Sequence, residues 1–369
     1  MLRPGSAGAR DPGPRFLGSL HEEIWLHRPP CVIGPFPAGT QWSLWRPVYG
    51  LRQAPREWHD TLRTTLAALG FAPSSAELSL FLRTNTSVPP FYVLVRDPPA
   101  LTWVLQRFGF RYSSPESTPL PTGHSHSAPP SDESLEPSGP YPELVGYLMY
   151  LMTCTRPDLA YPLSILARYV APARPRPEHW EAAKRVLHYL CSTSGMGLVL
   201  GGRGPVVLTG HADASWVDDL AMQRSSQGYT FSLSSGSVSW RSTRSSSVLR
   251  SSCEAEIYAG AMAAQELRWL TYLLTDFGER PRSAPVPYVD NKAMIALCQE
   301  HRLEHITKHI ALRYFRAREL QHRGQLHLAY VATRANTADV FTKALQSSDH
   351  QRFCTVLGLV PTLPHLLTA

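Results

Sequence analysis

The sequence predicts a mixed α/β fold, in which the C-terminal half of the chain forms a five-stranded mixed sheet with flanking helices. Two observations predict it. Between residues 204 and 346, strand-like and helix-like segments follow the order three strands, helix, strand, two helices, strand and helix. Residues 254–274, EAEIYAGAMAAQELRWLTYLL, repeat apolar side chains at helical spacing. One long helix should therefore pack against the sheet.

The strands of this half each have a distinct pattern. VVLTGHADASW, residues 206–216, is typical of a strand with Asp213 at its end. Residues 227–242 alternate around a Ser-Ser-Gly turn, which indicates a hairpin. PVPYVD indicates a short buried strand that ends in Asp290. Further segments are predicted as helix, helix and strand, at residues 291–300, 303–323 and 326–333.

Four acidic side chains lie at the ends or starts of these elements. They are Asp213, Glu256 in the first turn of the long helix, Asp290, and Asp339 in a last helix that Asn336 or Thr337 caps. Clustered carboxylates repel by several kcal/mol, even at an effective dielectric constant of about 20. They therefore need cations, and oxygen ligands select Mg²⁺ or Mn²⁺. The sequence predicts a site for two such ions, which can activate water and hold a phosphate.

Other acids compete for these roles. Glu254 lies two residues before Glu256, and Asp218 and Asp219 follow Asp213 in a predicted loop. Asp213 could instead be an ordinary turn residue. The charge of Asp339 could simply favour a helix N-terminus.

The first half of the chain carries distinctive motifs. They include FLGSLHEEIWLHRPP at 16–30 and VYGLRQAPREW at 48–58, followed by a helical pattern and a short LF strand. ELVGYLMYL, TRPDLAY and TKHIALRY occur further along. On these motifs the chain resembles the Pol polyprotein of copia-type retrotransposons, from about Phe16 to Leu345. The order of elements in the second half is also that of the ribonuclease H fold.

This resemblance implies a domain organisation. Residues 1–95 would be a reverse transcriptase palm, residues 141–200 a helical thumb or connection, and residues 204–346 a ribonuclease H-like domain. A Pro/Ser-rich composition predicts a linker at 96–140. Residues 347–369 would be a C-terminal tail.

The palm departs from the family pattern at its metal site. The family has YVDD on a hairpin, whereas here FYVLV is followed by RDPPALTWVLQRFGF, in which Asp97 stands alone. Asp11 lies near the place of the first palm aspartate, but Pro12 and Pro14 would break the strand that it needs. We therefore expect residues 1–95 to be a remnant without RNA-directed DNA polymerase activity.

The resemblance also implies roles for the four acids. Asp213 would bridge both ions, and Asp339 would help bind the ion that activates water. Glu256 and Asp290 would hold the ion that faces the leaving 3′ oxygen. The expected reaction is hydrolysis of the RNA strand of an RNA–DNA hybrid, which leaves 3′-OH and 5′-phosphate ends.

The charge of the chain suits a nucleic-acid partner. Its formal net charge is +7 over 369 residues. The predicted helix at 303–323 is strongly basic, and we expect phosphate contacts from Lys308, Arg313, Arg316 and Arg318. A solvated helix face is the alternative. The same two interpretations apply to the face formed by Lys184, Arg185 and His188.

Other features of the sequence give weaker signals. His305 and His309 have the i, i+4 spacing of zinc ligands, but no third ligand has a convincing spacing. Trp240 and Trp269 are predicted to lie in the core. None of the six cysteines forms CxxC, which argues against a zinc ribbon or a disulfide framework. The sequence shows no signal peptide or membrane span, so the expected compartment is the cytosol or nucleus. Nothing in it predicts an oligomeric state.

Two hypotheses for function follow. The first is a ribonuclease H with an inactive polymerase part. The second is a remnant that binds nucleic acid without catalysis.

Overall fold

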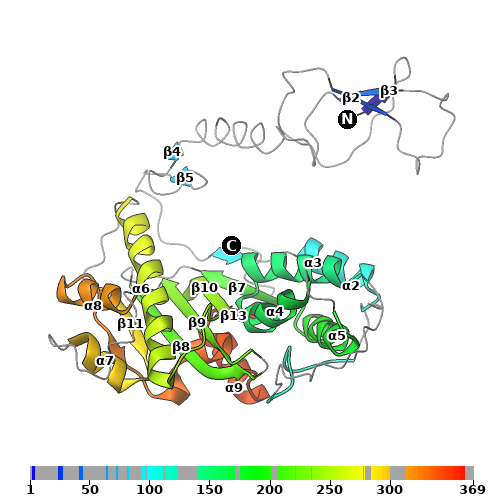
Figure 1. Ribbon diagram of the computed structural model, residues 1–369. Coiled ribbons are helices and arrows are strands. Elements are labelled where there is room, and N and C mark those ends of the chain that lie inside the picture. Colours follow the sequence, from blue (N-terminus) through cyan, green and yellow to red (C-terminus); the bar gives the residue numbers. More distant parts are fainter. Residues whose placement is uncertain are drawn as a thin grey trace. The chain divides into compact units, whose positions relative to one another are not determined.

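The chain divides into two compact units in the computed structural model (Figure 1). One unit contains residues 1–88 with Tyr272–Gly278, and the other contains residues 89–271 and 279–369. Between residues 2 and 95 the structure describes only short strands and residue 64. From residue 98 onward it describes ten ranges. These ranges are 98–110, 114–123, 140–170, 175–200, 207–220, 222–233, 235–276, 278, 284–299 and 313–361.

The first unit contains two small antiparallel sheets among its described residues. One has the order β1-β3-β2, and the other pairs β4 with β5. Their bounds are Leu2–Pro4 (β1), Ile24–His27 (β2), Gln41–Leu44 (β3), Ala72–Pro73 (β4) and Phe81–Leu82 (β5). The motif at 48–58 and both palm candidates, Asp11 and Asp97, lie outside the described residues.

The second unit is built on a five-stranded mixed sheet of order β10-β9-β8-β11-β12. The strands are β8 (Leu208–Asp219), β9 (Arg224–Leu233), β10 (Gly236–Arg244), β11 (Val286–Val289) and β12 (Ala329–Tyr330). β8, β9 and β10 are antiparallel, whereas β11 runs parallel to both β8 and β12. This confirms the predicted fold class and the order of its elements.

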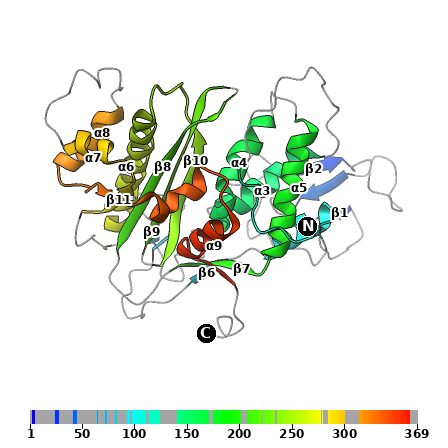
Figure 2. The same ribbon diagram turned by 90° about the horizontal axis from the view of Figure 1, so that it is seen from below.

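Helices join and flank this sheet. They are α6 (Ser252–Asp276), α7 (Lys292–Gln299), α8 (Arg313–His322) and the short 3-10 helix η5 (Thr337–Phe341). α6 lies along the sheet in both ribbon views (Figures 1 and 2). The predicted apolar stripe is buried, and its alanines allow a close approach: Ile257, Ala261, Ala264, Leu267 and Leu270 are at most 5% exposed. Ser239 Oγ on β10 donates to Glu266 Oε1 on α6 at 2.6 Å.

A group of helices lies beside β10 in both views, on the side away from α6 (Figures 1 and 2). It contains α2 (Pro98–Arg107), α3 (Tyr141–Cys154), η1 (Pro157–Leu159), α4 (Ala160–Leu166), η2 (Ala167–Tyr169) and α5 (Pro177–Ser192). Their apolar faces form one core, which includes Leu105, Leu148, Leu163 and Leu187. Trp240 of β10 donates its indole N–H to the carbonyl of Met152, which ties the sheet to α3.

The predicted linker at 96–140 differs from what the structure shows. Residues 98–107 form α2, and Leu101, Val104 and Leu105 are buried in the helical core. Leu120 is buried there too. The Pro/Ser-rich composition of the whole range concealed this apolar stretch, so the linker interpretation is wrong for these residues.

The predicted tail at 347–369 also contains packed structure. α9 (Ser347–Val356) buries His350, Phe353 and Cys354, and β13 (Leu359–Pro361) pairs with β7 (Met196–Leu200). β7 in turn pairs with β6 (Val93–Val95), so strands from three distant segments form one small sheet. The prediction of a simple tail is therefore wrong up to residue 361.

A buried ion pair anchors the helical group. Arg156 donates from Nε and Nη2 to the two oxygens of Asp158 at 3.0 and 2.7 Å. Tyr189 OH on α5 donates to Asp158 Oδ2 at 2.6 Å, and Arg156 Nη2 also reaches Thr193 Oγ1 at 2.7 Å. Burial by itself would raise the pKa of Asp158, but Arg156 and Tyr189 hold that pKa below its usual value.

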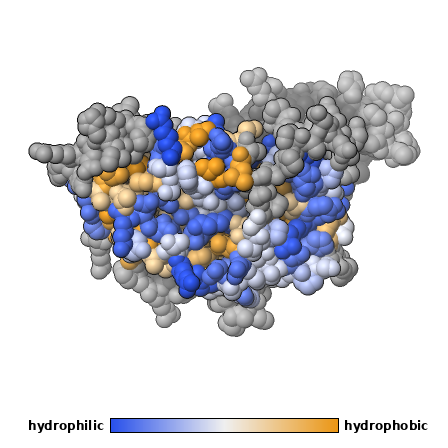
Figure 3. All heavy atoms as spheres, turned by 60° about the horizontal axis from the view of Figure 1, so that its bottom comes forward, coloured by the Kyte–Doolittle hydropathy of each residue, from blue (hydrophilic) through white to orange (hydrophobic). Residues whose placement is uncertain are grey.

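The surface of the molecule is mostly hydrophilic on the face in Figure 3, with separate hydrophobic patches. Trp269 is 40% exposed, so its assignment to the core is wrong. The spacing of the stripe on α6 already indicates this, because Trp269 lies two positions after Leu267 and therefore on the other side of the helix. Among the described helices, none has both the length and the apolar composition that a membrane span requires.

Candidate functional site

Asp213 lies in the middle of β8 rather than at its end, because β8 continues to Asp219. Its side chain is almost fully buried. Asp213 pairs with Gly228 on β9, where a Cβ would come within 2.5 Å of Phe341 Cβ. The glycine therefore lets η5 pack directly on the sheet beside Asp213.

Asp290 is brought beside Asp213 by strand register. Tyr288 on β11 pairs in parallel with His211 on β8. Asp290 follows Tyr288 by two residues, and Asp213 follows His211 by two residues. Side chains two residues apart lie on the same face of a sheet. The two acids therefore lie on the same face of the sheet, on neighbouring strands. As predicted, Asp290 directly follows a short strand, β11.

Glu256 reaches the same face from the start of α6. Arg250 N donates to Glu254 Oε2 at 2.7 Å, and Glu254 N donates to Ser251 Oγ at 3.1 Å. The Glu254 carboxylate thus accepts from a backbone N–H at the helix start, and it is not part of the group of close carboxylates. Carboxylate oxygens of Asp213, Glu256 and Asp290 all lie within 4.8 Å of one another.

Asp339 joins this cluster through η5. Asn336 caps this 3-10 helix by accepting from Ala338 N at 3.2 Å. Its Nδ2 donates to the carbonyl of Ala212 at 3.0 Å, which fixes η5 against the residue before Asp213. Asp339 does not belong to the group of three mutually close carboxylates, but it is linked to Asp213 through a lysine.

That lysine is Lys343. Its Nζ lies 2.9 Å from Asp339 Oδ1 and 3.5 Å from Asp213 Oδ2. Thr342 Oγ1 donates a hydrogen bond to Asp213 Oδ2. Sequence reasoning missed both residues, although Lys343 stands four positions after Asp339, the spacing at which helical side chains meet.

The electrostatics of the cluster are unfavourable for four free carboxylates. Burial, followed by repulsion from Asp213 and Asp290, raises the pKa of Glu256 to about 9. Burial and the charge of Asp213 likewise raise the pKa of Asp339 to about 7. Burial also raises the pKa of Asp213, against the opposing charge of Lys343. Such upward pKa shifts show that the single positive charge of Lys343 does not fully compensate these carboxylates.

Divalent cations fit this donor set. Glu256 Oε2 is a buried oxygen without a hydrogen-bond partner, and the buried Asp339 Oδ1 has the Lys343 ammonium group beside it. Three carboxylates with oxygens this close together offer the hard oxygen ligands that Mg²⁺ and Mn²⁺ prefer. The cluster can therefore hold at least one such ion between Asp213, Glu256 and Asp290.

The competing acids have other partners. Asp219 accepts from Arg168 and Arg244, and Asp218 accepts from Ser226. Both lie beyond Asp213 along β8, and the group of close carboxylates does not include them.

The basic residues predicted to contact nucleic acid are only partly described. Arg313, Arg316 and Arg318 belong to α8, and Arg318 is half-buried. Lys308 lies outside the described residues, as do His305 and His309. On α5, Arg185 pairs with Glu116 at 2.7 Å and His188 contacts the carbonyl of Ser114, so both side chains bind residues of the predicted linker.

Comparison with solved structures finds ribonuclease H domains. One is the N-terminal RNase H domain of rv2228c from Mycobacterium tuberculosis, which is 12% identical. It covers 40% of this chain and 96% of its own, with a TM-score of 0.28.

The proteins found by comparison with known sequences include transposon proteins and an effector protein. The model of the family described as reverse transcriptase (RNA-dependent DNA polymerase) matches residues 14–94. Secreted RxLR effector protein 161 of Plasmopara viticola is 46% identical over 36% of this chain and 92% of its own. The Retrovirus-related Pol polyprotein from transposon RE2 of Arabidopsis thaliana is 30% identical over 94% of this chain. The chain spans only 27% of that polyprotein's length. Together with the motifs along its sequence, this match shows that the chain belongs to the copia-type retrotransposon Pol polyprotein family.

Proposed function

We propose that the chain is a ribonuclease H that hydrolyses the RNA strand of RNA–DNA hybrids with two divalent ions, Mg²⁺ or Mn²⁺. The observation that carries the proposal is the convergence of Asp213, Glu256 and Asp290, whose carboxylate oxygens lie within 4.8 Å of one another. Their sequence separation leaves the fold as the only reason for this proximity, and the fold is one whose family members use such a site.

Each residue of the site would have a separate role in binding the ions or in positioning their ligands. Asp213, Glu256 and Asp290 would hold one ion, and Asp213 and Asp339 the other. When bound, the ions supply a polarised phosphate and a water of lowered pKa. Thr342 orients the carboxylate of Asp213, and Asn336 fixes Asp339 through η5. Lys343 neutralises part of the charge between Asp213 and Asp339. Lys308, Arg313, Arg316 and Arg318 are proposed to contact backbone phosphates.

The polymerase function is proposed to be lost. The family match covers residues 14–94, but residues 91–110 contain no adjacent pair of aspartates. A palm without that pair lacks ligands for its catalytic ions. Primer extension on an RNA template by the purified chain would contradict this part of the proposal.

A second candidate function is nucleic-acid binding without catalysis. The pairing of Lys343 with two of the four acids favours it, because an ammonium group there takes the place of one positive ion. This candidate predicts salt-sensitive binding of hybrids that Asp213→Asn leaves unchanged, and no cleavage.

Cleavage of a labelled hybrid tests the proposal directly. Purified chain at micromolar concentration with Mg²⁺ or Mn²⁺ is expected to shorten the RNA strand and leave the DNA strand intact, and EDTA should stop the reaction. RNA that stays intact under all metal conditions would leave only the binding function.

Metal binding is expected to release about one to two protons at pH 7. At that pH Glu256, with a pKa of about 9, is protonated, and Asp339, with a pKa of about 7, is about half protonated. An ion binds only the deprotonated carboxylates, so metal affinity should rise with pH up to about 9, and fewer protons should be released above it. Calorimetric titration of Mn²⁺ in buffers of different ionisation enthalpy measures the number released.

Glu256→Gln tests the source of the released protons, and Glu178→Gln is its matched control. It should lower the number of protons released at pH 7 by about one, since the amide does not titrate. Glu178→Gln removes an exposed acid from α5 and should leave the number unchanged. Equal proton release in all three proteins would show that Glu256 is ionised before metal binds.

Replacing Lys343 by glutamine is expected to tighten Mn²⁺ binding by about tenfold, since a competing positive charge beside Asp213 and Asp339 is removed. Calorimetric titration measures the change. Lys184→Gln on α5, where the lysine pairs with Glu181, is the control with the same loss of charge. Unchanged affinity in Lys343→Gln would place the lysine outside the metal-bound site.

A further inference from the structure

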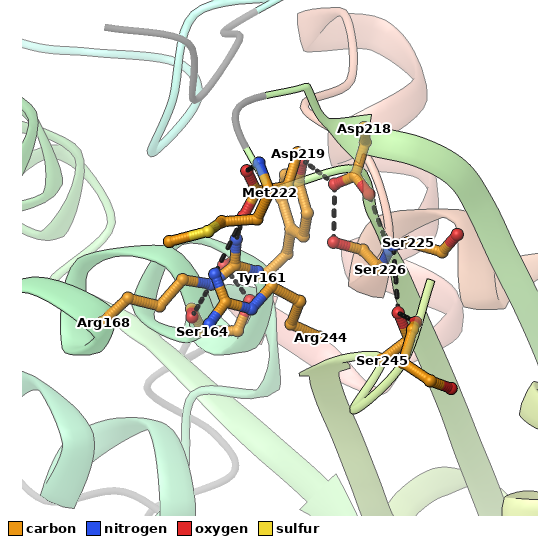
Figure 4. A network of polar contacts seen from close by, with 11 residues as sticks. Tyr161, Ser164, Arg168, Asp218, Asp219, Met222, Ser225, Ser226, Arg244 and Ser245 are labelled. Carbon is orange, nitrogen blue, oxygen red and sulfur yellow. Dashed lines mark hydrogen bonds and ion pairs between the residues drawn. The ribbon is translucent and has the colours of Figure 1, made fainter. Parts of the chain in front are cut away.

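A second polar cluster lies further along β8 than the carboxylate site. The pairing of β8 with β9 shifts register between Ser215 and Asp219, and this irregularity carries Asp218 and Asp219 toward α4 and η2. Asp219 Oδ2 accepts from Arg168 Nη1 at 3.1 Å and from Arg244 Nη1 at 2.9 Å (Figure 4). One carboxylate oxygen thus joins arginines from the helical group and from β10.

These arginines line a cavity of about 570 Å³, within the range of about 300–1,000 Å³ typical of ligand sites. Arg224, the first residue of β9, is the third arginine in its wall. Hydroxyl groups make up most of the rest, including those of Ser164 and Ser242. No carboxylate is among the described residues that line it.

Three donors around this cavity lack partners. Arg168 Nη2, Arg224 Nη1 and Ser242 Oγ are buried and make no hydrogen bond. Few such side-chain atoms occur in the described part of the chain, and another of them, Glu256 Oε2, belongs to the carboxylate site. Buried polar groups nearly always have a partner, so a concentration of unpaired donors indicates a missing acceptor.

The charge of the cluster also lacks compensation. Arg168, Arg224 and Arg244 carry three positive charges, and two carboxylates face them. Asp219 is shared between Arg168 and Arg244. Asp218 acts on Arg168 only through its charge, because its hydrogen bonds come from Ser226 N and Oγ and from Tyr161 OH. One positive charge is therefore in excess. Burial and the charge of Arg244 lower the pKa of Arg168. An anion in the cavity would relieve this repulsion and accept from the unpaired donors.

We propose that this cavity, between η2 and the adjoining ends of β9 and β10, binds a phosphate group through Arg168, Arg224 and Ser242. Phosphate offers several acceptor oxygens at tetrahedral positions, which suits guanidinium and hydroxyl donors that approach from three elements. The group can belong to the backbone of a nucleic acid or to a free phosphate ion. The proposal does not depend on hybrid cleavage, because binding alone is tested.

The first arm of the test uses inorganic phosphate and the full chain, in a buffer free of phosphate and sulfate. Calorimetric titration should show one saturable site. Arg224→Gln should weaken binding at least about tenfold, since a charge-assisted hydrogen bond is lost. Arg352→Gln removes an exposed arginine on α9 and should leave binding unchanged.

The second arm uses a short RNA–DNA hybrid in EDTA, so that no strand is cleaved. If the phosphate comes from the nucleic-acid backbone, Arg224→Gln should reduce the slope of log K against log salt by roughly 0.9, the loss of one phosphate contact. Arg352→Gln should not reduce it. Weaker phosphate binding with an unchanged hybrid slope would assign the cavity to free phosphate.

Circular dichroism checks that the variants fold. Ser242→Ala removes one unpaired donor with little change in volume, so it tests the cavity even if Arg224→Gln unfolds. Phosphate binding that is absent, or that is equal in wild type, Arg224→Gln and Ser242→Ala, would overturn the proposal.

Discussion

Replacing Asp213 by asparagine is expected to lower the rate of hybrid cleavage by about a thousandfold or more. Asp213 links the two parts of the site, since it contacts Thr342 and Lys343 and also belongs to the group of close carboxylates. Loss of its charge removes a ligand shared by both proposed ions. Several kcal/mol of transition-state stabilisation would be lost, and each 1.4 kcal/mol or so corresponds to a factor of ten in rate.

The stability of this variant separates chemistry from folding. Burial and repulsion penalise the charge of Asp213 in the absence of metal, so Asp213→Asn should unfold at the same temperature as wild type, or higher, in EDTA. Asp349→Asn, an exposed acid on α9, is the matched control and should keep the full cleavage rate. Cleavage by Asp213→Asn at the wild-type rate would contradict the proposed metal site.

Replacing Asp158 by asparagine is expected to destabilise the second unit by about 3–5 kcal/mol. Asp158 and Arg156 have side chains that are 0% and 4% exposed, and the carboxylate accepts from Arg156 and Tyr189. Asparagine would leave the guanidinium buried without an opposite charge. Urea unfolding followed by tryptophan fluorescence measures the change in free energy of unfolding.

A double-mutant cycle shows whether the pair is the cause. Arg156→Met combined with Asp158→Asn should cost less than the sum of the single changes, because no charge is then left uncompensated. Asp349→Asn should change stability little, since its pair with Arg352 is exposed. A loss below about 1 kcal/mol in Asp158→Asn would show that water compensates Arg156.

The order of strands and helices in the second half, and the four acids of the site, could be predicted from the sequence alone. Strand alternation and the helical stripe from Ile257 to Leu270 are local properties, so they could be read from residues close together in the chain. The position of Asp290 after a short strand was equally local. The length of β8 was not, because pairing with β9 extends it past Asp213 to Asp219.

The groups that complete each site, in contrast, become visible only in the folded chain. Lys343 lies between Asp213 and Asp339, Glu254 serves the start of α6, and Asp219 binds two arginines. α2 and α9 pack into cores although their sequences resemble a linker and a tail. The physical reason is the same throughout: burial and charge compensation depend on neighbours that are far away in sequence, and no local pattern of residues specifies those neighbours.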